Sequence, residues 1–310
     1  MKKAIVTGGA GFIGSHMVDL LINKKFQVIV LDNLSGGHLK NLSQHKKNSN
    51  FKFIKTDITK KINQIFFTGV DYVFHFAGIG DIVPSIVKPD NYMRANIQGT
   101  VNVLEASRKS KIKKFVYAAS ASCYGKTKNK VSEKNIINLE HPYALSKYLG
   151  EQSTFHWSKI YGLPVNSIRI FNAYGPRVRT TGAYGAVIGV FFKQKLSNKP
   201  LTVVGNGNQS RDFVHVKDIV TAFYLAAETK LNGYCFNVGS SVPTSVNKLA
   251  SIIGGKIIKI PDRPGEPKNS LADTRLIRSK LGWKPKIKFE EGINEMLIKI
   301  KDWKKAPLWT

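Results

Sequence analysis

The chain has 310 residues, a mass of 34.5 kDa and a formal net charge of +28. With 42% hydrophobic residues it can bury a sizeable core, which excludes a wholly disordered basic chain. No apolar run is long enough for a transmembrane helix, and two cysteines, Cys123 and Cys235, are too few for a disulfide framework or a usual metal site. The basic excess is spread evenly over residues 1–150 and 151–310 and is mostly lysine, so we interpret it as a solvated surface and expect no nucleic-acid partner.

The first strand-like run, Lys3–Thr7, begins almost at Met1. This position leaves no room for a signal or transit peptide, and the low cysteine content suits a reducing compartment. We therefore expect a cytoplasmic protein that has no membrane partner.

The first part of the chain alternates β-branched runs with helical patterns. Strands are expected at Ala4–Thr7, Gln27–Leu31, Phe51–Thr56, Tyr72–Phe76, Lys114–Ala119 and Val165–Ile170. Helices are expected at Ile13–Asn23, Lys60–Phe67, Asn91–Ser110 and Tyr143–Tyr161. This alternation predicts an α/β fold of the Rossmann type, a doubly wound parallel sheet with helices on both faces.

The sequence pattern changes after Tyr174: the predicted helices and strands become shorter, and glycine and proline become more frequent. We predict a Rossmann domain over residues 1–174 and a smaller, mixed α/β substrate lobe over residues 175–310, which includes a helix at Glu290–Trp303. Segments near 213–239 have the pattern of a helix and strand that return to the main sheet.

A glycine-rich loop joins the first strand to the first helix in the spacing G-x-x-G-x-x-G. A turn that brings backbone close to a pyrophosphate needs positions without Cβ, and the following helix start supplies N–H donors. The strand–loop–helix context is the one that this motif requires. The predicted dinucleotide contacts are Gly8, Gly11, Phe12, Ile13 and Gly14.

Asp32 ends the second predicted strand. A carboxylate there can accept from both ribose hydroxyls of an adenosine and would repel a 2′-phosphate, which favours NAD over NADP as cofactor. The alternative is a simple turn residue in the sequence Asp32-Asn33-Leu34-Ser35-Gly36. Asp57, after the third strand, is suitably placed to contact adenine.

Tyr143 and Lys147 form a Y-x-x-x-K pair at the start of a predicted helix and share one helix face. A nearby ammonium stabilises a phenolate, so we expect Lys147 to lower the pKa of Tyr143 and make it a usable base. Ser120 ends the fifth strand, where its hydroxyl should face the ligand crevice beside Tyr143.

Taken in chain order, these motifs resemble the extended short-chain dehydrogenase/reductase family, in its NAD-dependent nucleotide-sugar epimerase/dehydratase branch. The resemblance covers nearly the whole chain and implies an NAD-binding Rossmann domain, a lobe for a nucleoside diphosphate sugar, and a homodimer formed by helices around residues 92–110 and 143–160. It rests on the sequences GGAGFIG, His75-Phe76-Ala77-Gly78, Asn96-Ile97-Gln98-Gly99-Thr100, Arg169-Ile170-Phe171-Asn172, Tyr174-Gly175-Pro176 and Arg211-Asp212-Phe213.

The resemblance also implies roles for individual residues. Ser120, Tyr143 and Lys147 match the catalytic triad, and Lys147 would also bind the nicotinamide ribose. Arg211 and Arg263 match diphosphate-binding arginines, although Arg263 could be a surface arginine; His75 is given no ligand role. Further cofactor contacts are implied at Asn33, Ile58, Phe76, Ala77, Gly78 and Asn96, and substrate contacts at Gly80, Ser122, Asn172 and Ser270.

Departures from the family pattern favour one branch. In the 4,6-dehydratases that this family includes, the positions matching Ser120, Ala121 and Ser122 are occupied by Thr-Asp-Glu. Decarboxylating members should also carry a carboxylate there. The GDP-sugar reductase-epimerases need NADPH, which Asp32 disfavours. A redox-neutral 4-epimerase of the UDP-glucose or UDP-N-acetylglucosamine type, working through a transient 4-keto sugar, is the function that remains.

Two positions point to a roomy sugar pocket. Ser270 matches a position that holds a tyrosine in the UDP-glucose 4-epimerases restricted to simple hexoses. Gly80 matches a position that holds a lysine in the same enzymes. The smaller side chains leave room for an acetamido or carboxyl group on the sugar.

Two rival functions remain open at this stage. One is a nucleotide-sugar 4-dehydrogenase or 4,6-dehydratase that releases a keto sugar. The other is a non-catalytic dinucleotide-binding or RNA-binding relative, which is disfavoured because Ser120, Tyr143 and Lys147 are all intact.

Overall fold

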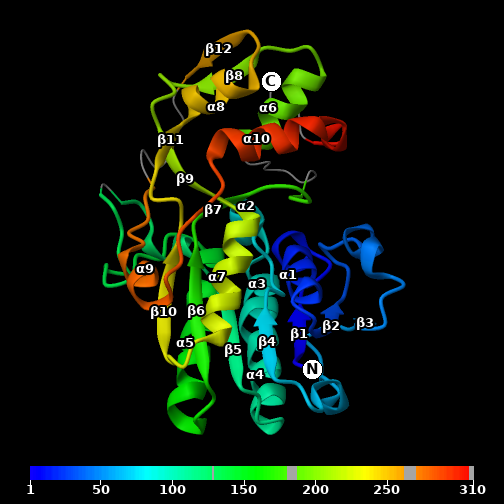
Figure 1. Ribbon diagram of the computed structural model, residues 1–310. Helices are drawn as coiled ribbons and strands as arrows, with labels where there is room; N and C mark the ends of the chain where they lie inside the picture. The colour runs from blue at the N-terminus through cyan, green and yellow to red at the C-terminus, as the bar shows by residue number, and fades with distance from the viewer. Residues whose placement is uncertain (128, 180–186, 262–269, 307–310) are drawn as a thin grey trace.

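The computed structural model describes residues 1–127, 129–179, 187–261 and 270–306 (Figure 1). Within these ranges no helix has both the length and the apolar character needed to cross a membrane. The larger part of the molecule is a layered α/β body, and a smaller group of strands and helices lies at one end of it (Figure 1).

A seven-stranded sheet in the order β10-β6-β5-β4-β1-β2-β3 forms the centre of the larger body, and every neighbouring pair is parallel. This order confirms the predicted Rossmann-type sheet. The strands begin and end within one residue of the predicted bounds where a prediction was made. They are β1 (Lys3–Thr7), β2 (Gln27–Asp32), β3 (Phe51–Lys55), β4 (Tyr72–His75), β5 (Lys114–Ser120), β6 (Val165–Ile170) and β10 (Tyr234–Val238).

Helices cover both faces of this sheet because its central strands are apolar on both sides. Helices α1 (Phe12–Asn23) and α7 (Val216–Glu228) pack on one face, in a core that includes Val6, Met17 and Phe223. Helices α4 (Gly99–Lys109) and α5 (Pro142–Tyr161) cover the other face.

The helix predicted at Asn91–Ser110 is interrupted. The structure has α2 (Ile82–Val87), α3 (Pro89–Met93), a π-helical turn at Arg94–Gln98 and then α4. The prediction at Lys60–Phe67 was also too long, because only a 3₁₀ turn forms, at Gln64–Phe67. Further 3₁₀ turns lie at Leu39–His45, Ala121–Tyr124 and Ile300–Trp303.

The smaller lobe has its own core, built around Phe191, Phe192 and Trp303. One sheet, in the order β11-β9-β7, joins it to the larger body, and a parallel pair, β12 and β8, lies further out. Its elements are β7 (Asn172–Tyr174), α6 (Val187–Leu196), β8 (Leu201–Val204), β9 (Ser210–His215), β11 (Pro243–Ser245), α8 (Val246–Ile253), β12 (Ile257–Ile260) and α10 (Phe289–Ile298); α9 (Arg275–Leu281) contacts β10.

The returning segment behaves differently in its three parts. Strand β9 stays in the smaller sheet, whereas α7 packs on the main sheet and β10 pairs with β6 along its edge. The predicted helix at Glu290–Trp303 is α10 followed by a short 3₁₀ turn.

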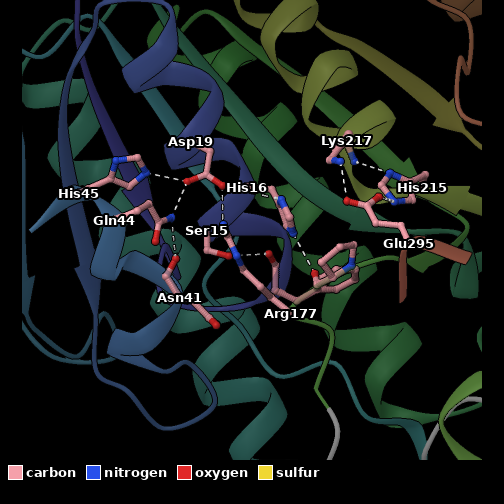
Figure 2. A network of polar contacts seen from close by, with 12 residues as sticks. Ser15, His16, Asp19, Asn41, Gln44, His45, Arg177, His215, Lys217 and Glu295 are labelled. Carbon is pink, nitrogen blue, oxygen red and sulfur yellow. Dashed lines mark hydrogen bonds and ion pairs between the residues drawn. The ribbon is translucent and has the colours of Figure 1, made fainter. Parts of the chain in front are cut away.

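A polar cluster centred on Asp19 of α1 joins the larger body to the smaller lobe (Figure 2). We call it the Asp19 cluster: its carboxylate contacts Gln44 and His45 at 2.7 and 2.6 Å and Arg177 at 2.8 Å. Beside it, the His16 ring lies 2.8 Å from the carbonyl oxygen of Pro176. Segments distant in sequence are therefore held together at the junction of the lobes.

Candidate active site

The loop between β1 and α1 leaves no space for side chains. A Cβ on Gly14 would lie 2.2 Å from the carbonyl oxygen of Gly8, and a Cβ on Gly8 would lie 2.7 Å from the Ala77 nitrogen. Gly8 also has φ of +67°, which favours glycine. Because the N-cap residue Gly11 has no side chain, the first-turn N–H groups of α1, where Phe12 and Ile13 lie, can bind an anion.

The Asp32 carboxylate lies at the end of β2, next to this loop. It accepts the backbone N–H groups of Ala10, at 2.9 Å, and Leu34, at 2.7 Å. Two acceptor positions of the carboxylate remain for ribose hydroxyls. Asp32 thus holds the loop in shape as well as standing where the sequence predicts an adenosine contact.

The predicted adenine side of the site lies after β3. The Asp57 carboxylate accepts the N–H and the hydroxyl of Thr59, and these hydrogen bonds, the backbone one first, lower the pKa of Asp57. Asn33 is exposed, and its Oδ1 accepts from Ser35, whereas Ile58 is buried against the start of α4. Asp57 is therefore engaged by a local turn through one of its carboxylate oxygens.

The segment after β4 closes this side of the site. Phe76 packs into the main core, where its ring centroid lies 4.5 Å from that of Phe223, and Ala77 donates its N–H to Thr7 at 3.3 Å. His75 is fully buried between Thr7 and Thr100, with contacts of 2.7 and 2.9 Å. Burial lowers the pKa of His75 to about 3, so this residue is a neutral structural group, as expected.

The π-helical turn presents Asn96 to the loop after β4. Its side chain accepts the Ile79 N–H at 2.8 Å and donates to the Ile79 carbonyl at 3.0 Å, and it also donates to Ser146 of α5 at 2.9 Å. A Cβ on Gly78 would lie 2.5 Å from Asn96 Oδ1. Asn96 therefore fixes the segment around Ile79 against α5.

Ser120, Tyr143 and Lys147 are brought together as predicted, at the carboxyl end of β5 and the start of α5. Ser120 contacts Ser122 at 2.9 Å and forms a hydrogen bond with the Tyr143 hydroxyl. The Tyr143 ring stacks on His141, with centroids 5.9 Å apart, and meets the ring of Tyr92 edge to face. These contacts orient the phenol toward the strand end.

The expected lowering of the Tyr143 pKa is wrong for the surroundings that the chain itself provides. Burial raises the pKa of Tyr143, and the hydrogen bond from Ser120 opposes this effect. The Lys147 ammonium lies 4.5 Å from the centroid of the Tyr117 ring, and burial lowers its pKa to about 7. Both groups are thus shifted toward their neutral forms, which is the state that a dry site favours.

Of the residues predicted to hold the substrate, Gly80, Ser120, Ser122 and Tyr143 lie in the larger body, and Asn172 and Arg211 lie in the sheet that joins it to the smaller lobe. Asn172 is half-buried in β7, and Arg211 lies in β9, half-buried, with a hydrogen bond of 3.0 Å to the Ser210 carbonyl. Ser270 is half-buried just before Leu271, whose carbonyl accepts from Val131. Arg263 lies outside the described residues.

Sequence reasoning missed an ion pair near Tyr143. Asp81, directly after Gly80, contacts Arg179 at 2.8 Å. The Asp81 charge also acts to raise the pKa of Tyr143. Arg179 follows the Tyr174-Gly175-Pro176 motif closely, which is the one sequence signal that could have drawn attention to it.

A glycine loop at a helix start, an acidic strand end and a Ser–Tyr–Lys group beside it define a dinucleotide-binding enzyme. The chain belongs to the NAD dependent epimerase/dehydratase family, whose model matches residues 4–239. NAD is the cofactor of this family, and the residues fit it, because the cradle around Gly8 and Gly14 would be filled by any Cβ.

Individual relatives resemble the chain over nearly its full length. The UDP-glucose 4-epimerase of Mycolicibacterium smegmatis is 34% identical, covering 94% of this chain and 96% of its own. The structure of UDP-N-acetylglucosamine 4-epimerase from Methanobrevibacter ruminantium, in complex with UDP-N-acetylmuramic acid, is 33% identical, with a TM-score of 0.90 and coverage of 97% of both chains.

The UDP-glucuronic acid 4-epimerase of Bacillus cereus, solved with UDP-glucuronic acid and NAD, is 31% identical, with a TM-score of 0.89 over 97% of this chain and 99% of that one. Relatives of the chain also include UDP-sugar decarboxylases. The family is therefore established, whereas the sugar substrate differs among the relatives.

Proposed function

We propose that the chain is an NAD-dependent 4-epimerase of a UDP-sugar, with residues 1–174 holding the cofactor and residues 175–310 holding most of the nucleotide sugar. The observation that carries this proposal is the grouping of Ser120, Tyr143 and Lys147 around a strand end where Ala121 and Ser122 supply no carboxyl group. Such a site can move a proton at O4 but lacks, at this strand end, an acid for elimination from the sugar.

The chain's own residues handle the proton and the orientation of the sugar. Tyr143 takes the O4 proton, while the Ser120 hydroxyl, already hydrogen-bonded to Tyr143, holds O4 in place. A protonated Lys147 stabilises the phenolate and binds the nicotinamide ribose. NAD, held by the glycine-rich loop and Lys147, would supply a reversible hydride acceptor for C4.

Because burial raises the pKa of Tyr143, the phenolate needs this ammonium nearby at neutral pH. After the sugar has turned in the site, the same tyrosine gives the proton back on the other face of the ring. We assign binding of the diphosphate to Arg211 and Arg263, because a guanidinium group can donate two parallel hydrogen bonds to phosphate oxygens. We assign a contact with the nucleotide to Asn172.

We assign a UDP-N-acetylhexosamine as the preferred substrate. Ser270 is small and half-buried, and a Cβ added to Gly80 would meet nothing within 4 Å. This space supports a substituent larger than a hydroxyl.

Decarboxylation and dehydration are the competing activities among relatives. Both differ from epimerisation in their products: a decarboxylase releases a pentose and carbon dioxide, and a dehydratase or dehydrogenase releases a keto sugar. The absence of a carboxyl group at Ala121 and Ser122 disfavours the first two, and a dehydrogenase would accumulate NADH with each sugar converted.

The test is a product assay on UDP-glucose, UDP-N-acetylglucosamine and UDP-glucuronate, read by NMR of the C4 proton. We expect interconversion at C4, fastest with the N-acetylated sugar, without net NADH. Tyr143→Phe should abolish turnover and retain NAD, whereas Tyr161→Phe, at the exposed end of the same helix, should be unaffected. No C4 inversion of any of the three sugars would overturn the proposal.

We also propose a homodimer that forms through the outer faces of α4 and α5. The end of α5 exposes Ile160 and Tyr161, 55% and 49% accessible, and Leu149 borders a hollow lined by α5 and by Ile97 of the π-helical turn that precedes α4. Apolar side chains gathered on one helix face support a partner of the same kind. Sedimentation velocity should show a dimer, and Leu149→Glu should shift it toward monomer; a monomeric wild-type chain would refute this assembly.

A further inference from the structure

Glu151 is a buried carboxylate that the proposed reaction does not use. It lies on α5 one turn beyond Lys147 and two turns beyond Tyr143, and only 1% of it is accessible to solvent. Acidic side chains are almost never so completely buried unless they are paired. Groups that bind Glu151 therefore also act on the helix that carries Tyr143 and Lys147.

The partners of Glu151 come from the two neighbouring strands of the main sheet. Arg169 of β6, itself 6% exposed, donates from Nε at 3.1 and 3.2 Å and from Nη2 at 2.5 Å. Ser167 of the same strand donates at 2.9 Å, and the thiol of Cys235 on β10 lies 3.4 Å away. Three groups therefore anchor the middle of α5 to the sheet.

The contacts continue from Arg169 toward the substrate lobe. Arg169 Nη1 donates to the Tyr124 hydroxyl at 2.8 Å, which donates to Asn237 Oδ1 at 2.8 Å, and Asn237 donates to the Val131 carbonyl at 2.9 Å. The same carbonyl accepts the Asp273 N–H at 2.7 Å.

This network of hydrogen bonds connects three parts of the proposed site. Its start shares a helix with Lys147, and its end holds Asp273, three residues beyond Ser270 in the sugar pocket. Tyr124 in its middle belongs to the 3₁₀ turn that follows Ser120. All three parts of the candidate site are thus connected to one buried network.

We propose that Glu151 is a positioning residue of the epimerase: its ion pair with Arg169 fixes α5 to the sheet and holds a carboxylate one helical turn from Lys147, on the same helix face. This inference rests on the proposed function for its catalytic meaning, but the state of Lys147 can be measured without turnover. Glu151 does not touch the reacting atoms, and it acts through Lys147.

The surroundings of Lys147 explain why it needs such a partner. Its ammonium faces the Tyr117 ring from β5, neutral His75 from β4, Asn96 from the π-helical turn and Tyr143 from its own helix. None of these four side chains is a carboxylate. Burial lowers the pKa of Lys147 to about 7, and the charge of Glu151 opposes that effect.

The test follows the pH midpoint of Lys147 in protein labelled with ¹³C at lysine Cε, with Lys147→Arg used to assign the signal. In Glu151→Gln we expect the midpoint to fall by about one pH unit, because the opposing charge is gone. The alkaline limb of kcat should move down with it. An unchanged midpoint would overturn the proposal, whatever the activity of the protein.

Two controls separate charge from packing. Glu151→Gln leaves Arg169 buried without a carboxylate, and this unpaired cation would itself lower the Lys147 midpoint. E151Q/R169M removes both charges, so its midpoint should fall less than in Glu151→Gln but stay below the wild-type value. Arg169→Lys keeps a cation beside Glu151 and should leave the midpoint near the wild-type value. A wild-type midpoint in E151Q/R169M would mean that the unpaired Arg169, and not the lost Glu151 charge, causes the shift; a shift in Arg169→Lys equal to that in Glu151→Gln would mean that packing is responsible. Either result would overturn the proposal.

These outcomes are distinct from failure of the proposed function. A wild-type chain that inverts no UDP-sugar at C4, yet shows the shifted Lys147 midpoint in Glu151→Gln, would refute the reaction and retain the electrostatic role of Glu151. An active wild type with an unshifted midpoint would do the reverse.

Discussion

The Glu151 network and the Asp19 cluster are both built on a carboxylate that gathers an arginine and smaller donors from distant segments. They differ in their access to water: Glu151 is 1% exposed, whereas a quarter of the Asp19 side chain is accessible. Arg169 is buried with its partner, and Arg177 is 26% exposed. Similar groups are therefore placed once between α5 and the sheet and once at the edge between the lobes, where Figure 2 shows the Asp19 cluster.

The difference shows what each arrangement can do. Charges inside the protein interact strongly and over longer distances, because little water lies between them, so the Glu151 network can act on the chemistry of Lys147. Charges at the edge are screened by water and salt, so the Asp19 cluster can guide how the lobes meet but cannot tune a distant group. Similar ion pairs thus act over a longer distance when they are buried than when they are exposed to water.

The largest effect should come from breaking the buried pair. Arg169→Met leaves the Glu151 carboxylate in the interior without a cation, and we expect a loss of about 3–5 kcal/mol in the free energy of unfolding, measured in urea. The double variant E151Q/R169M should recover much of that loss, because no unpaired charge remains. If the double variant is as unstable as Arg169→Met, the cost lies in packing and the electrostatic contrast is wrong.

Acid should produce a smaller effect that also depends on depth. Burial lowers the pKa of His75 to about 3, below that of an unfolded histidine, so the unfolded state binds more protons. The stability contributed by neutral His75 is complete above pH 6.5 and is lost as the pH falls toward 3.

Between pH 7 and pH 5 this loss should amount to about 2 kcal/mol for one such histidine. His75→Gln should therefore flatten the decline of unfolding free energy over this range, as measured by urea titrations at each pH. His38→Gln, at an exposed histidine, serves as the matched control and should leave the decline unchanged. Equal slopes in wild type and His75→Gln would contradict this expectation.

The smallest effect should come from the Asp19 cluster. Asp19→Asn keeps the shape and an acceptor oxygen but removes the charge that faces Arg177 and His45, and we expect a loss of about 1 kcal/mol or less. The loss should shrink in 1 M salt. Asp90→Asn, in an exposed pair with Arg94, should change nothing measurable. A loss at Asp19 as large as that for Arg169→Met would remove the distinction between the two regions.

Local patterns in the sequence were sufficient for the strands of the main sheet and for the meeting of Ser120, Tyr143 and Lys147. Strands buried on both faces have continuous apolar runs, and the carboxyl ends of parallel strands share one edge. The interruption of the helix around Asn96 could not be read in this way. In the turn Asn96 binds both backbone groups of Ile79, a contact between distant segments that local sequence patterns do not contain.

The electrostatics of the site were also beyond the sequence. The spacing of Tyr143 and Lys147 indicates that the two share a helix face, but the direction of each pKa shift depends on how deeply the fold buries them. The pair of Asp81 and Arg179 and the network of Glu151 join residues with no local relation in the chain. Such contacts follow from the topology, which brings β4, β5, β6 and β10 side by side.

The place of β10 at the edge of the main sheet has a consequence for synthesis of the protein. Residues 1–174 supply six of the strands, yet α7 and β10 cover one face and one edge of them and are made only after β7, α6, β8 and β9. As the chain leaves the ribosome, residues 1–174 therefore keep the part of this face that α7 covers, and the free edge of β6, exposed until residue 238 has emerged. A fragment ending at residue 174 would keep that face exposed, so a nascent chain stalled there is a natural client for chaperones.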